Sequence, residues 1–152
     1  DSHKTYTLYH SDLNTFSLQR LRLMGELKDA LAEGQLSLYY QPKMSLSDDK
    51  IRSVECLIRW IHPEHGFIPP DDFIPLAESS GLIIELGQWI IEQACERCKA
   101  WQEQGLGNLC IAVNVSAVQF KRDDFFNIVQ WTDAVQECTH FRVAFITILH
   151  TS

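Results

Sequence analysis

Two charged residues interrupt the apolar run SVECLIRWI (53–61), and they are the first candidates for chemistry. The run is typical of a strand, whose alternate side chains point to opposite faces, so Glu55, Leu57 and Arg59 are predicted to share one face. A carboxylate and a guanidinium on a buried strand are costly unless the charges are paired or used in a site. Spacing alone favours a structural Glu55–Arg59 pair, and a functional site is the alternative.

Polar residues also end two other predicted strands. Gln41 ends a strand at 36–42, and Asn114 and Ser116 end a strand at 109–116. In parallel α/β folds, ligands gather at the carboxyl ends of the strands. Each of these residues alone is more often a loop cap, but three polar residues at strand ends in one sheet favour a binding site. Composition does not name the ligand.

Three other motifs favour structural interpretations. Cys95 and Cys98 form one CxxC inside a helical pattern, which is more typical of buried helix cysteines than of a zinc or redox site. His62 and His65 form an HxxH in a Pro-rich loop without a helix beneath it, so metal binding is the less favoured interpretation. Asn114–Ser116 matches a glycosylation sequon, but it lies on a strand predicted to be buried. The scattered cysteines, five in number, indicate a reducing, cytoplasmic setting.

The elements that must position these residues alternate between strands and helices. We expect strands at 36–42, 53–61, 109–116 and 142–149, and helices ending at Gly34, from Asp71 to Ala77, at 82–101 and at 123–138. A turn is predicted at 47–49 and a Pro- and Gly-rich loop at 62–70. The alternation predicts an α/β fold with parallel pairing. Residues 1–20 lack periodicity and are expected to be a linker or the tail of a preceding domain.

Composition limits the classes of protein that fit. The chain has 152 residues, the length of one domain, and 45% of them are hydrophobic, which is ordinary for a globular protein. The net charge of −7 makes binding to a long nucleic acid a poor expectation, because phosphate contacts need Lys and Arg. The longest apolar runs fall far short of the ~20 residues of a membrane helix. We therefore expect no membrane insertion of this segment.

A resemblance to a known family is carried by YYQPKMSL (39–46), VECLIRWIHPEHGFIPPDDFIPLAESSGLI (54–83) and AVNVSAVQF (112–120). These stretches are similar to the EAL domain family, whose signature tripeptide is present as Glu55-Cys56-Leu57, with Cys in place of Ala. The resemblance covers roughly residues 22–124. EAL domains are eight-stranded β/α barrels and bacterial phosphodiesterases that linearise cyclic di-GMP to pGpG with Mg²⁺ or Mn²⁺. The resemblance implies that residues 21–152 form a partial EAL-type β/α barrel with parallel strands, corresponding to about the N-terminal half of the full barrel.

The resemblance also implies roles for individual residues. Glu55 resembles the metal-binding glutamate of the signature, and Asn114 resembles the metal-binding asparagine at the end of the third strand. Gln41, Leu57 and Arg59 resemble residues that hold the dinucleotide, with Arg59 on a phosphate. These residue types suit the implied roles, because Mg²⁺ prefers carboxylate and amide oxygens and the planar guanidinium of arginine fits phosphate oxygens.

The sequence departs from the family pattern after residue 124. The family's fourth strand carries a metal-binding glutamate, and the nearest match here, FITI (145–148), places Phe145 at that position. The family's paired aspartates, catalytic lysine and later glutamates have no counterpart in this sequence. Two-metal hydrolysis needs several carboxylates around two cations, and Glu55 with Asn114 supplies one negative charge.

We therefore expect a protein related to cyclic di-GMP phosphodiesterases whose chain is inactive alone, with a residual nucleotide-binding, regulatory or protein-interaction role. One alternative is an active metal-dependent phosphodiesterase once a missing C-terminal half completes it. Another is a truncated gene product without function. Because a partial barrel leaves sheet edges open, we expect a homo-oligomer, most simply a dimer. The domain is expected in the cytoplasm, alone or within a larger bacterial signalling protein.

Overall fold

The computed structural model describes residues 11–106 and 109–121 of the chain. The helices are α1 (Ser11–Glu33), α2 (Pro70–Ser80), α3 (Ile83–Glu103) and the short α4 (Ala117–Phe120). The strands are β1 (Leu36–Met44), β2 (Ile51–His62), β3 (Gly66–Ile68) and β4 (Cys110–Val113). The helix expected at 123–138 and the strand expected at 142–149, with Phe145, lie outside the described residues. None of the helices in the described part is both long and apolar enough to cross a membrane.

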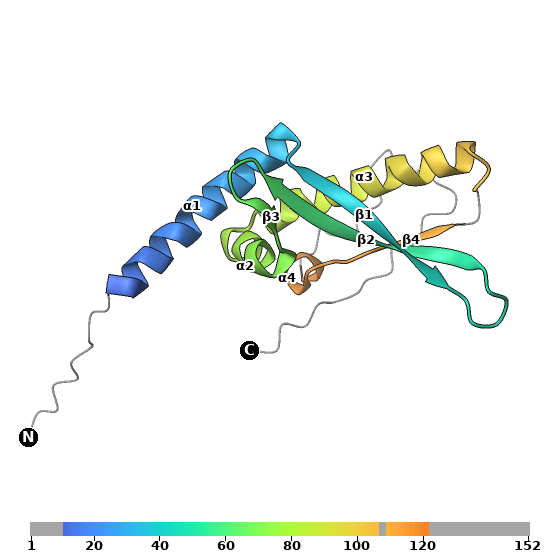
Figure 1. Cartoon of the computed structure of the whole chain (residues 1–152), viewed down its shortest axis with the longest axis horizontal. Helices are drawn as coiled ribbons and strands as arrows, with labels where there is room; N and C mark the ends of the chain where they lie inside the picture. Colours follow the sequence, from blue (N-terminus) through green and yellow to red (C-terminus); the bar gives the residue numbers. More distant parts are fainter. Residues whose placement is uncertain (1–10, 107–108, 122–152) are drawn as a thin grey trace, which may run out of the picture.

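The sheet is built around the long strand β2 (Figure 1). β1 pairs antiparallel with β2 over the whole length of β1, and β3 pairs antiparallel with the end of β2. β4 pairs with β2 in parallel, from Ser53↔Cys110 to Cys56↔Val113. The mixed helix and strand arrangement confirms the predicted α/β fold of a partial β/α barrel, with α2 and α3 forming the crossover to β4.

The prediction of parallel pairing is wrong for the first two strands, which pair antiparallel. β1 and β2 are joined by a short turn that includes the predicted residues 47–49, with Asp49 at a positive φ of 53°. A connection this short can reverse the chain but cannot carry it back for a parallel pair, which needs a dozen or more residues. The connection from the end of β2 at His62 to the start of β4 at Cys110 is long enough, and there the pairing is parallel as predicted.

Several element boundaries differ from the sequence expectation, and three of the differences are as follows. α1 begins at Ser11, so part of the segment expected as a linker is helical, and the helix ends before Gly34, whose φ is 71°. The loop expected at 62–70 contains β3. α2 is capped by Pro69 rather than by Asp71, with a proline in its first turn, where the missing N–H costs no hydrogen bond.

The hydrophobic core lies on one face of β2, where Val54, Cys56 and Trp60 are buried as the strand period predicts. α3 covers this face with buried side chains, and the Trp60 ring meets the Phe73 ring of α2 edge-on at 5.6 Å. Cys95 and Cys98 are buried on α3, in agreement with the structural interpretation of the CxxC. The opposite face of β2 is therefore free to carry polar side chains.

Candidate functional site

The residues predicted to do chemistry share the face of the sheet opposite to the core. Residues paired directly across strands lie on the same face, and Gln41 pairs with Glu55 while Glu55 pairs with Ala112 on β4. Two residues further along, Asn114 is on that face too. We call this surface the polar face and define it by Gln41, Lys43, Glu55, Arg59 and Asn114.

Glu55 and Asn114 are brought into contact, as expected for two ligands of one site. Asn114 Nδ2 donates a 3.1 Å hydrogen bond to Glu55 Oε1, and both side chains are partly buried. Asn114 Oδ1 is buried, and within the described residues it has no hydrogen-bond partner. The Glu55 carboxylate and the Asn114 amide oxygen are both hard oxygen donors, the type that Mg²⁺ and Mn²⁺ prefer.

The cationic partner of Glu55 is Lys43, which sequence reasoning missed. Lys43 Nζ lies 2.8 Å from Glu55 Oε2. This contact, followed by the Asn114 hydrogen bond, holds the pKa of Glu55 below its usual range. The Glu55–Arg59 pair favoured by spacing is wrong, because four residues along a strand span about 13 Å. The signal for Lys43 was its position two residues after Gln41, on the same face of a strand.

Arg59 is placed further along the polar face. Its Nη1 donates a 2.9 Å hydrogen bond to the carbonyl of Ile58, and its guanidinium carbon lies 5.6 Å from the centre of the Tyr39 ring. Arg59 forms no salt bridge within the described residues, so its remaining N–H donors can serve an anionic ligand. Leu57 lies between Glu55 and Arg59 on the same face and is partly buried.

A cavity of about 130 Å³ adjoins these residues. Its lining includes Leu57, Arg59, Asn114, Ser116 and, from α2, Glu78. Ser116 Oγ donates a hydrogen bond to Glu78 Oε1 and accepts one from the Val118 N–H at 3.2 Å, so it caps α4. For Ser116 the loop-cap interpretation is therefore confirmed. Glu78 was missed because nothing in the helical pattern of α2 distinguishes it from a surface acid.

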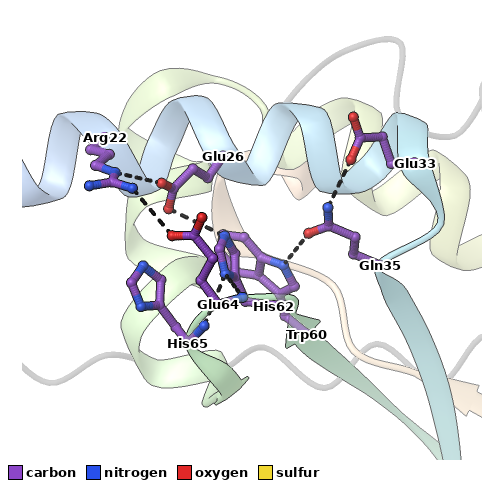
Figure 2. Close-up of polar contacts among 8 residues, drawn as sticks. All are labelled: Arg22, Glu26, Glu33, Gln35, Trp60, His62, Glu64 and His65. Atoms are coloured by element: carbon purple, nitrogen blue, oxygen red, sulfur yellow. Dashed lines mark hydrogen bonds and ion pairs between the residues drawn. The ribbon is translucent and has the colours of Figure 1, made fainter.

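A second polar cluster joins α1 to the end of β2, where Glu26, His62 and His65 place possible ligand atoms within 4.8 Å of one another (Figure 2). His62 Nδ1 accepts the backbone N–H groups of Glu64 and His65 at 3.1 and 3.2 Å. Its proton therefore lies on Nε2, which is 3.5 Å from Glu26 Oε2. A metal at Nε2 would require a proton on Nδ1, against those two donors. The cluster fits a structural contact better than a metal site.

Comparison with known proteins gives this geometry a family. The EAL domain model matches residues 24–146. The bifunctional diguanylate cyclase/cyclic di-GMP phosphodiesterase MucR of Pseudomonas aeruginosa is 42% identical over 115 residues, which are 76% of this chain and 17% of MucR. The cyclic di-GMP phosphodiesterase PdeR of Escherichia coli is 38% identical over 125 residues, 82% of this chain and 19% of PdeR. The chain thus spans less than a fifth of these relatives.

Solved structures agree with the sequence comparison. The phosphodiesterase PaMucR in complex with c-di-GMP matches with a TM-score of 0.73 and 38% identity, over 79% of this chain and 49% of that one. The EAL domain of Xanthomonas citri FimX in complex with c-di-GMP shares the fold, with a TM-score of 0.64 at 19% identity, over 77% of this chain and 45% of that one. The chain belongs to the EAL domain family.

Proposed function

We propose that this chain binds cyclic di-GMP on the polar face and does not hydrolyse it alone. The observation that carries the proposal is the convergence of Glu55 and Asn114 on one face of the sheet, with Arg59 further along it. Relatives with this domain are named as cyclic di-GMP phosphodiesterases, and a similar structure is a c-di-GMP complex. Those relatives contain many residues outside the region that matches this chain.

Four residues of the polar face, together with Leu57, have a chemical role in this proposal. Glu55 and Asn114 would hold a Mg²⁺ or Mn²⁺ ion through a carboxylate and an amide oxygen. Arg59 would donate hydrogen bonds to a phosphate, Gln41 would offer its amide and Leu57 an apolar contact. A cation held there would supply polarisation of a phosphoryl oxygen and a lowered pKa of a bound water molecule.

We propose no hydrolysis by this chain alone, because the polar face carries too little negative charge to hold two metal ions. Among the side chains that the described strands place on the polar face, Glu55 is the one carboxylate, and Lys43 already offsets its charge. A two-metal centre needs several carboxylates to hold both ions. The chain's own residues can orient a nucleotide and bind one divalent ion weakly, and a role in regulation or protein interaction follows from binding.

Two measurements test the proposal. Calorimetry of the 152-residue chain with cyclic di-GMP and Mn²⁺ should show binding. Separation of the products should show no pGpG. Steady formation of pGpG that disappears in Glu55→Ala would overturn the absence of hydrolysis. No heat of binding would overturn the nucleotide-binding role and favour a product without function. Activity confined to a longer protein that contains this segment would favour completion of the site by further residues.

The state of assembly and the location are also proposals. One edge of β1 pairs with β2, and none of the strands described here pairs with the other edge. An open edge pairs readily with another chain, so we propose a two-fold dimer of the 152-residue chain. Light scattering that shows a mass near 17.5 kDa would contradict it. A cytoplasmic location fits the buried Cys56 thiol, since that compartment keeps thiols reduced.

A further inference from the structure

Both oxygens of the Glu55 carboxylate are occupied by donors from the flanking strands. Lys43 Nζ on β1 lies 2.8 Å from Oε2, and Asn114 Nδ2, beyond the end of β4, donates to Oε1 at 3.1 Å. These are the oxygens through which Glu55 would bind a cation. The arrangement is therefore a closed one, in which the two carboxylate oxygens already accept from an ammonium and an amide.

Lys43 is the more exposed partner of its contact with Glu55. Its side chain is 47% exposed, whereas that of Glu55 is 20% exposed. The ladder between β1 and β2 shifts register between Lys43 and Met44, so Lys43 lies at the end of the regular pairing. A long, flexible side chain at such a point can turn its ammonium into solvent without disturbing the sheet.

We propose that Lys43 is an internal counter-cation that occupies Glu55 in the absence of a divalent ion and sets the affinity of the site for that ion. The inference rests on the proposed cation-binding role of Glu55 and Asn114. The ammonium donates into the lone pairs that the ion needs, and two cations at one carboxylate repel each other. Binding of the ion therefore requires Lys43 to move away.

The same change involves the Asn114 amide. Its Nδ2 faces Glu55, while its Oδ1 is buried without a hydrogen-bond partner in the described structure. A half-turn of this amide exchanges the two atoms and presents the oxygen beside the carboxylate. Displacement of Lys43 and rotation of Asn114 together convert the closed geometry into a pair of oxygen ligands.

The affinity of the 152-residue chain for Mn²⁺ tests the inference without any activity measurement. Electron paramagnetic resonance measures it through the signal of the free ion. Lys43→Met removes the charge and keeps the length of the side chain. It should tighten Mn²⁺ binding by about three- to tenfold, the scale of losing a partly exposed competing ion pair. Lys43→Arg keeps a competing cation and should bind no more tightly than the parent.

Lys50→Met is the matched control, since it removes the same charge from the exposed loop between β1 and β2. It should leave the affinity at the parent value, which separates local competition from the effect of net charge. Circular dichroism checks that each variant is folded. A second readout is thermal unfolding, in which Mn²⁺ should raise the midpoint of Lys43→Met more than that of the parent.

The outcomes separate the inference from the function on which it rests. If the parent binds Mn²⁺, loses it in Glu55→Gln, and Lys43→Met binds equally or more weakly, the role of Lys43 is overturned and the cation site stands. If Lys43→Met alone binds the ion, the inference is supported in its strongest form. If neither protein binds Mn²⁺, the cation site itself is refuted and the inference with it.

Discussion

Asn114 and Glu55 are 59 positions apart in the sequence, yet Asn114 Nδ2 donates a 3.1 Å hydrogen bond to Glu55 Oε1. The contact exists because β4 returns parallel to β2, with Glu55 opposite Ala112. It joins the two residues that the family resemblance assigns to a cation. The hydrogen bond is charge-assisted, and it offsets part of the cost of partly burying the Glu55 carboxylate.

Replacing Asn114 by alanine should destabilise the fold by about 1–2 kcal/mol, because Glu55 loses a hydrogen bond to a charged group. Urea unfolding at neutral pH measures the change. In a double-mutant cycle, Glu55→Ala and Asn114→Ala together should cost less than the sum of the single changes. Strictly additive effects would show that the hydrogen bond contributes nothing to stability.

Glu55 should make stability depend on pH. Its pKa is lowered in the folded state by Lys43 and then by Asn114, so the folded chain favours the ionised form. The stabilisation is present above the pKa of the unfolded chain and is lost as the pH falls through the folded pKa. The gap in unfolding free energy between the parent and Glu55→Gln should therefore narrow on acidification below about pH 4.

Arg59→Ala should weaken cyclic di-GMP binding by about 1–3 kcal/mol, the scale for loss of a charge-assisted hydrogen bond. The matched control is Arg52→Ala on the same strand, where Arg52 is paired with Asp48 near the hairpin turn. Calorimetry should show the loss in Arg59→Ala and parent-like binding in Arg52→Ala. Equal losses in both variants would indicate a general effect of charge rather than a phosphate contact.

Gly87 is required by the packing of α4 against α3. A Cβ at this position would lie 2.7 Å from Gln119 Cδ and closer still to Nε2, and Gln119 is buried and bound through Oε1 to the Ser116 N–H. Gly87→Ala should destabilise the parent by about 1–2 kcal/mol, because the Gln119 hydrogen bond is lost.

Gly87→Ala should stabilise the protein instead of destabilising it once the Gln119 side chain is shortened. In a Gln119→Ala background the obstruction is gone, and alanine in a helix interior is better than glycine by about 1 kcal/mol. Denaturant unfolding of the four proteins of this cycle checks both signs. Destabilisation by Gly87→Ala in both backgrounds would mean that the clash lies elsewhere.

The Cys56 thiol should be inert in the native protein. Burial, and then the nearby Glu55 charge, raise the pKa of Cys56 to about 12, so the reactive thiolate is scarce at pH 8. Iodoacetamide at that pH, followed by peptide mass spectrometry, should leave Cys56 unmodified until denaturant is added. Rapid modification without denaturant would show that β2 opens or that its core face is accessible.

Local patterns in the sequence determined which face of β2 enters the core. Val54, Cys56 and Trp60 are buried and Glu55, Leu57 and Arg59 are not, because the two-residue period is a property of the strand backbone itself. The family, too, was identified from short stretches of adjacent residues, the motifs around Glu55 and Asn114. The buried cysteines of α3 followed from helical spacing.

Only the tertiary structure decided which residues meet. Lys43, rather than Arg59, pairs with Glu55 because β1 runs antiparallel to β2 in a register that a strand period cannot specify. Glu78 accepts a hydrogen bond from Ser116 although 38 positions separate the two residues, because the fold brings α2 close to the start of α4. A residue's face is set by its own backbone within a few positions, whereas its partner is set by the turns and crossovers that bring distant segments together.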